Sequence, residues 1–148
     1  CVSRAIFGAA LGVGSVGTNV CIGALTAPFT VIALGTTNTA ETSADKVLAA
    51  ETSATGLGAS RGTVVFTNST GLSGGVGSAS KVVITKAFTN TSGGTVNVVE
   101  AGLFNDTAAS TNGMFARKTF TSIAVANNDQ LTVAWTIQMG NTTSFLPG

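Results

Sequence analysis

The sequence predicts an all-β fold, an antiparallel β-sandwich or jelly roll preceded by an apolar, glycine-rich N-terminal arm. Apolar side chains recur at every second position from Leu131 to Met139, which is typical of a strand with one buried face. Earlier in the chain, short runs of β-branched and apolar residues are separated by turns of Gly, Asn, Ser and Thr. Such runs indicate a series of short strands. Only one short segment, residues 45–51, has helical character.

The chain divides into an N-terminal arm of residues 1–26 and a β-sandwich domain of residues 27–148. Residues 5–35 contain no charged residue, and this length alone would permit a membrane helix. Glycines recur through the segment, and each disfavours a helix by about 0.5–1 kcal/mol relative to Ala. Three interpretations are open: an extended arm buried in a neighbouring subunit, an apolar helix in a filament core as in pilins, or ordinary core strands. The arm and the core strands are favoured over the helix.

Five apolar side chains of the arm are the predicted subunit contacts, namely Ile6, Phe7, Leu11, Val13 and Val16. The only cysteines, Cys1 and Cys21, are a candidate disulfide, within one chain or between subunits, if the protein is exported. Because the chain has no His, these two cysteines do not make a zinc site.

The predicted strands follow one another at short intervals. They cover residues 29–34, 63–67, 81–89, 95–99, 114–120, 123–126 and 131–139. The first, FTVIAL, is almost entirely apolar or β-branched, as expected of a strand buried on both faces. Trp135 in the last strand is the predicted core anchor, and residues 45–51 (DKVLAAE) are the one helix candidate, with Ser43 as its N-cap. About seven or eight strands at near-regular spacing indicate a sandwich or jelly roll.

The composition excludes most kinds of catalytic site. Without His, the chain has neither a Ser-His-Asp relay nor a Cys-His pair. Only Glu41 and Asp45 among its carboxylates lie at helical spacing, and two carboxylates do not define a calcium loop. Residues 12–17 (GVGSVG) match the spacing of a dinucleotide fingerprint but lack its strand and helix context. We therefore expect no enzyme activity, cofactor, metal or small-molecule substrate.

The surface is expected to be poor in charge. The net charge is +1 and charged residues make up 9% of the chain, against about a quarter in ordinary soluble domains. No basic field draws such a chain to nucleic acid, and a near-neutral surface favours association. We therefore expect subunit contacts to cover much of it. The alternative is a secreted domain whose exposed face is Thr, Ser and Asn.

Four N-x-[ST] triplets lie at predicted turns or in the C-terminal tail, at Asn68, Asn90, Asn105 and Asn141. They are candidate N-glycosylation sites if the protein is exported from a glycosylating cell. If the protein belongs to a phage, they are expected to be bare.

Residues 100–120 (EAGLFNDTAASTNGMFARKTF) combine two apolar stretches with a polar loop. Leu103 and Phe104 fit the end of a strand entering the core. Glu100 and Arg117 are placed to pair across adjacent strands and would then mark the strand register. An exposed pair of this kind contributes only about 0–1 kcal/mol. The alternative is two unrelated solvated charges.

Three stretches, VVEAGLFND, GMFARKTF and NNDQLTVAWTIQM, occur in this order. Together they resemble the C-terminal half of a group of bacteriophage virion proteins with the patterns E-x-G-L-F-[ND], M-x-A-R-x-x-F and D-x-L-T-V-x-W-T-I. The upstream VIALGTTNTAETSADKVLAAE is similar to the stretch I-A-x-G-T-G-x-T and its acidic continuation in that group. The resemblance covers roughly residues 31–139 and departs from the family in the first thirty residues. It implies a structural β domain of a virion or tail, not a catalyst.

We therefore expect a non-enzymatic structural subunit that assembles with copies of itself into an extracellular helical filament or a virion or tail structure. The arm would add as a strand to an open groove of the next subunit, and head-to-tail joining that does not close builds helical filaments. A membrane is expected to be involved only through the N-terminal segment during export. The alternatives are a receptor- or carbohydrate-binding module of a phage tail fibre and a membrane-anchored, pilin-like subunit.

Overall fold

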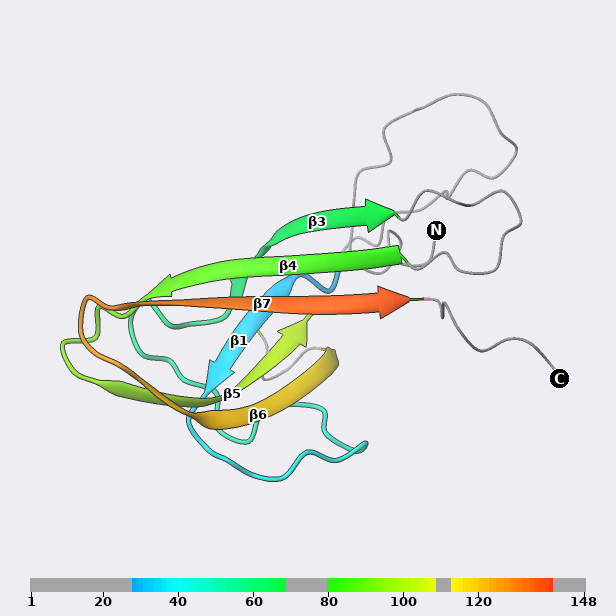
Figure 1. The fold of residues 1–148 in the computed structure, drawn as a ribbon. Helices are drawn as coiled ribbons and strands as arrows, with labels where there is room; N and C mark the ends of the chain where they lie inside the picture. Colours follow the sequence, from blue (N-terminus) through cyan, green and yellow to red (C-terminus); the bar gives the residue numbers. More distant parts are fainter. Residues whose placement is uncertain (1–27, 69–79, 109–112, 140–148) are drawn as a thin grey trace, which may run out of the picture.

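A computed structural model of the chain describes residues 28–68, 80–108 and 113–139. These residues form seven strands and no helix, arranged in two antiparallel sheets (Figure 1). The four-stranded sheet has the order β2-β1-β5-β6 and the three-stranded sheet the order β3-β4-β7. The predicted all-β class and its antiparallel sandwich arrangement are therefore confirmed. No helix in the described ranges is long and apolar enough to cross a membrane.

The strand bounds are β1 Val31–Gly35, β2 Ser60–Arg61, β3 Thr63–Asn68, β4 Ser80–Thr89, β5 Val96–Phe104, β6 Met114–Val125 and β7 Gln130–Met139. Most agree with the expected positions. The two strands predicted over 114–120 and 123–126 are one continuous strand, β6, and β5 runs on to the buried Phe104. The two-residue strand β2 was not expected.

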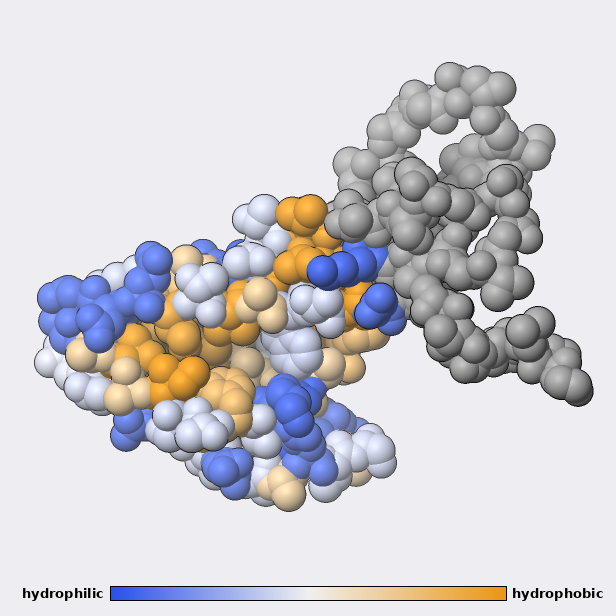
Figure 2. Space-filling model, viewed as in Figure 1, coloured by the Kyte–Doolittle hydropathy of each residue, from blue (hydrophilic) through white to orange (hydrophobic). Residues whose placement is uncertain are grey.

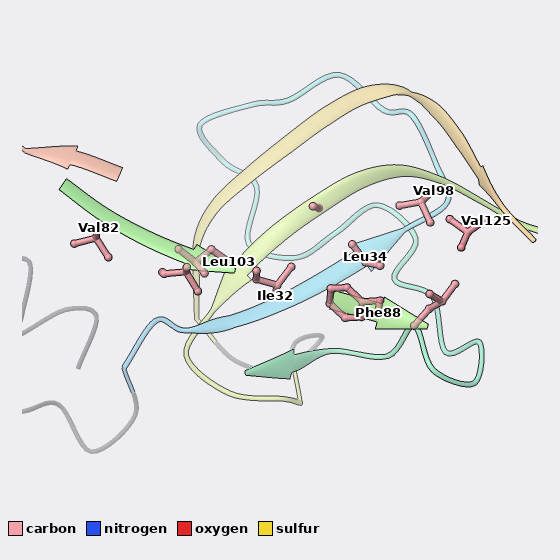
Figure 3. Close-up of a cluster of buried hydrophobic side chains, with 10 residues drawn as sticks. Ile32, Leu34, Val82, Phe88, Val98, Leu103 and Val125 are labelled. Atoms are coloured by element: carbon pink, nitrogen blue, oxygen red, sulfur yellow. The ribbon is translucent and has the colours of Figure 1, made fainter. Parts of the chain in front are cut away.

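The main core lies between the two sheets (Figure 3). Its buried members are Ile32, Leu34, Leu57, Val82, Ile84, Phe88, Val98, Ala101, Leu103 and Val125. The alternating side chains of β7 pack against this cluster as partly buried residues, Trp135 among them. The indole Nε1 of Trp135 is itself buried and has no hydrogen-bond partner among the described residues.

A second apolar cluster lies on the other face of the four-stranded sheet. Val31, Ala33 and Phe104 contribute from the sheet, and Leu48 covers them from the loop that follows β1. Every residue of β1 is therefore buried, as its apolar sequence predicted. The loop between β1 and β2 acts as a third layer over this sheet.

Residues 45–51 do not form the predicted helix; they are irregular in the structure. The N–H groups of Ala49 and Ala50 donate instead to the carboxylate of Glu100, at 3.2 and 2.9 Å. Asp45 turns back to accept a hydrogen bond from the Thr42 N–H. Tertiary partners thus take up the backbone donors that a helix would use, and local helix propensity is overridden.

One end of the sandwich is closed by two turns that are bonded to each other. Asn90 is fully buried, and its side-chain Nδ2 donates to the carbonyls of Gly94 and Val125 at 2.8 and 2.7 Å. Its backbone N–H donates to Asp129 O, and its carbonyl accepts from Asn128 N–H. Asn128 has a φ of 71°, which Asn tolerates better than most residues. Residues 127 and 128 form the turn that joins β6 to β7.

Candidate functional site at the sheet edges

The two long outer strands of the sandwich, β6 and β7, are consecutive in the chain but belong to different sheets. Figure 1 shows that they lie close together at the turn joining them and diverge towards the other end of the sandwich. The remaining outer strands are shorter, two residues in β2 and six in β3. The edges of β6 and β7 are therefore the longest places where another chain could bind.

The edge of β7 is regular, and it is open within the part of the chain that the structure describes. β7 pairs with β4 over ten consecutive positions without a register shift, and no described strand pairs with its other side. Its sequence QLTVAWTIQM contains neither a charged residue nor a proline. The described outward side chains of the strand, from Gln130 to Gln138, are exposed.

The inward side chains of β7 are only partly covered. On the adjacent strand β4, Val82, Ile84 and Phe88 are at most 1% exposed. The corresponding residues of β7 are intermediate in burial, namely Leu131, Val133, Trp135 and Ile137. Figure 2 shows apolar side chains gathered in the hollow between the two sheets on the side where β6 and β7 form the rims. The core is thus less completely covered along the β7 edge than at its centre.

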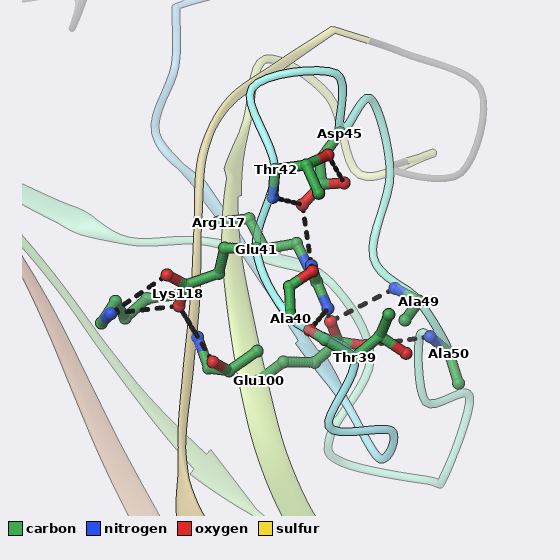
Figure 4. A network of polar contacts seen from close by, with 11 residues as sticks. Thr39, Ala40, Glu41, Thr42, Asp45, Ala49, Ala50, Glu100, Arg117 and Lys118 are labelled. Atoms are coloured by element: carbon green, nitrogen blue, oxygen red, sulfur yellow. Dashed lines mark hydrogen bonds and ion pairs between the residues drawn. The ribbon is translucent and has the colours of Figure 1, made fainter.

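The edge of β6 is irregular and occupied. Its pairing with β5 has register shifts between Val98 and Glu100 and between Leu103 and Phe104. The carboxylate of Glu41, from the loop after β1, accepts hydrogen bonds from the backbone N–H and the hydroxyl of Thr119 (Figure 4). The ammonium group of Lys118 lies 3.1 Å from the same carboxylate. The Glu41 side chain therefore occupies the Thr119 N–H, a backbone donor that a strand added beside β6 would need.

These contacts lower the pKa of Glu41 to about 2. The largest cause is the hydrogen bond from the Thr119 backbone N–H, followed by the hydrogen bond from Lys118. Each of these contacts favours the ionised carboxylate. Glu41 is therefore a charged cap on the β6 edge at any pH well above 2.

A buried ionic cluster anchors the loop that carries Glu41. Glu100 on β5 is fully buried, and Arg117 Nε on β6 donates to it at 2.7 Å. Arg117 Nη1 lies 2.7 Å from an Asp45 carboxylate oxygen, and Nη2 donates to the carbonyl of Thr39 at 2.8 Å. Figure 4 shows these groups joining two strands of the sheet to the loop. We call Asp45, Glu100 and Arg117 the loop anchor.

The loop anchor is structural because its groups are already used by one another. The hydrogen bonds from the Thr42 backbone and hydroxyl, and then that from Arg117, lower the pKa of Asp45 to about 2. The guanidinium of Arg117 bonds two carboxylates and the carbonyls of Thr39 and Ala40, which leaves it few donors for a ligand. The predicted Glu100–Arg117 contact is confirmed. Its burial, however, makes it more than the exposed register marker that the sequence suggested.

The described residues contain no group of three or more Cys, Asp or Glu side chains that could hold a metal ion. The predicted pair Glu41 and Asp45 is not a cation site in this arrangement. Glu41 faces β6, and Asp45 faces Arg117. The chemistry offered by the site is main-chain hydrogen bonding and apolar contact.

Several predicted site residues lie outside the described ranges: the arm contacts Ile6, Phe7, Leu11, Val13 and Val16, the candidate disulfide Cys1 and Cys21, residues 12–17, and Asn141. The other triplets are in the fold. Asn68 ends β3, and Asn105 is partly buried, with no hydrogen-bond partner for its Oδ1 among the described residues. Asn90 is fully buried and hydrogen-bonded, so the folded chain has no room for a glycan there.

Sequence reasoning missed the cap at Glu41 and the difference between the two edges. Glu41 and Thr119 are 78 residues apart, and no local pattern links them. Comparison with protein-family models, curated proteins and solved structures finds no match to this chain. The resemblance to phage virion proteins therefore stays a prediction.

Proposed function

We propose that this chain is a non-enzymatic structural subunit that assembles with copies of itself into an extracellular helical filament or a virion or tail structure. The observation that carries this proposal is the edge of β7. It is ten residues long, regular, uncharged and unpaired in the described structure, and its inner row of apolar side chains is only partly covered.

Such an edge is a binding site for an extended chain. A strand laid beside β7 gains main-chain hydrogen bonds, and its alternate side chains fill the hollow next to the inner row. Proteins that stay monomeric usually protect long edges with charges, proline or bulges. β6 carries such protection, whereas β7 has no charge, no proline and no register shift.

Association with identical copies suits the charge of the chain. With a net charge of +1 and 9% charged residues, copies repel one another weakly. If the added strand comes from the N-terminal arm, the contact joins two different surfaces. A contact of that kind produces an open helical array when it does not close into a ring. The resemblance to virion proteins supports the same role.

Electron microscopy and sedimentation of the full-length protein test the proposal. We expect regular polymers from the full chain and none, or far fewer, after deletion of residues 1–20. A full-length chain that stays monomeric at high concentration would rule out the structural role. Normal polymers from the deleted chain would rule out donation of the arm.

A further inference from the structure

We propose that β7 is the single acceptor edge of each subunit and that its occupant is the N-terminal arm of a neighbouring copy. This inference rests on the proposed function and deepens it. It names the strand that receives the partner, the segment that binds, and the reason that the other edges do not take part.

The edge of β6 is occupied by a loop side chain, and the edges of β2 and β3 are shorter than that of β7. The edge of β6 is interrupted by two register shifts, and Glu41 holds the Thr119 N–H. β2 has only two residues. β3 has six residues, all paired regularly with β4, so its edge is about half as long as that of β7. β7 alone offers ten regular positions.

The arm matches this edge in charge and in length. From residue 5 to residue 27 the chain has no charged side chain, so a strand made from it carries no charge into the apolar hollow. Ten residues of strand span roughly 33 Å, and the arm is long enough to cover the whole of β7 and still reach Pro28.

The side-chain pattern of the arm also suits an edge with one apolar row. In an extended strand, Phe7, Leu11 and Val13 share one face, and the glycines at 8, 12 and 14 share the other, with Ile6 and Val16 on either side of them. The apolar face would cover the inner row of β7. The glycine-rich face would lie beside the small outward residues Thr132, Ala134 and Thr136, which are exposed.

One donor and one acceptor per subunit determine the kind of assembly. The arm of one copy occupies the β7 edge of the next, so that edge is not available for β7–β7 pairing between two copies. The contact therefore joins unlike surfaces and is repeated head to tail. Each subunit should therefore bind one neighbour through its arm and another through β7, which gives a single unbranched row of subunits.

The test uses the full-length protein and disables the arm and the β7 edge in separate variants. Thr132→Lys/Thr136→Lys places charges on the β7 edge, a device that blocks strand addition. Leu11→Lys/Val13→Lys does the same to the arm. Ala87→Lys is the matched control because Ala87 lies opposite Thr132 on the central strand β4 and is also exposed. Trp135, the only Trp of the chain, lies on β7 and reports binding through its fluorescence.

We expect each double variant to remain monomeric where the wild type polymerises, and Ala87→Lys to polymerise. Mixing the two double variants should give discrete 1:1 pairs, because one retains the arm and the other retains the acceptor. Trp135 emission should shift on mixing. Circular dichroism verifies folding, and the single variants Thr132→Lys and Thr136→Lys replace the double variant if it fails to fold.

Other outcomes overturn specific parts of the proposal. Normal polymers from the β7 variant would show that the arm binds elsewhere, while the structural role would stand if the arm variant is monomeric. Loss of polymers in Ala87→Lys as well would indicate a contact through the sheet face. If both double variants are monomeric but do not pair on mixing, the arm is not exchanged between copies. A monomeric wild type whose arm is protected from proteases would lead to the same conclusion.

Discussion

The strands β6 and β7 are joined by one turn, and each forms the outer edge of its sheet, yet their edges differ. β6 has two register shifts and a carboxylate hydrogen-bonded to its backbone, whereas β7 pairs regularly with β4 and has no described strand along its other side. Under our proposal, this difference leaves one edge of the domain open to strand addition and the other closed.

The loop between β1 and β2 makes this difference. It packs Leu48 against the four-stranded sheet, it is held by the loop anchor, and it carries Glu41 to β6. The three-stranded sheet has no corresponding layer among the described residues. Variants that loosen this loop should therefore make the two edges more alike. We expect the largest effects from the variants that most destabilise the loop anchor.

Arg117→Met should have the largest effect, because it leaves the Glu100 carboxylate buried without its guanidinium. Removing one partner of a buried ion pair costs roughly 3–5 kcal/mol. We expect the free energy of unfolding, measured by urea denaturation, to fall by about this amount, and native-state proteolysis to begin in the loop. Lys118→Met is the control, since the Lys118 side chain is 66% exposed. Equal losses from both variants would contradict the role of the loop anchor.

Gly35→Ala should have the next largest effect. A Cβ at Gly35 would overlap with Glu100 Oε1, so the buried carboxylate would have to move away from Arg117 and the loop. Overpacking of this kind costs about 1–3 kcal/mol. Gly58→Ala is the matched control because no atom lies within 4 Å of its added Cβ. The two variants should differ clearly in urea midpoint; the same midpoint for both would show that the carboxylate is not confined.

Glu41→Gln should convert β6 from a closed edge into a partly open one with little change in stability. It weakens the acceptor for the Thr119 N–H and removes the charge that faces Lys118. We expect side-by-side association, seen as rising light scattering or as bundling in electron microscopy. Asp106→Asn removes one charge at a loop where the carboxylate accepts hydrogen bonds from Thr107 and Ala108. Bundling in both variants would point to lost charge and not to an opened edge.

Acid should produce the smallest effect, and only at low pH. The pKa values of Glu41 and Asp45 are both lowered to about 2. Their stabilising contribution is therefore complete above the ordinary values of 4.5 and 3.8 and is lost as the pH falls through about 2. The urea midpoint of Glu41→Gln should fall less steeply than that of the wild type between these limits. Parallel curves would show that Glu41 does not contribute.

The sequence predicts the elements that depend on local pattern and misses those that depend on distant partners. The alternation from Leu131 to Met139 and the apolar run of β1 were enough to place both strands. The helix expected over 45–51 was wrong because Glu100, about fifty residues away, takes the N–H groups of Ala49 and Ala50. The Glu100–Arg117 contact was predictable from strand pairing, but its burial depends on the loop above it.

The buried side chain of Asn90 has a consequence for producing this protein in cells. Asn90 begins the triplet Asn-Thr-Ser, and its amide nitrogen holds Val125 O at the closed end. In a eukaryotic secretory pathway, sugar transfer to the nascent chain would compete with folding, because a modified amide nitrogen could not fit between the two turns. Chains modified at Asn90 would fail to close the sandwich, so a bacterial host is the better source of native material.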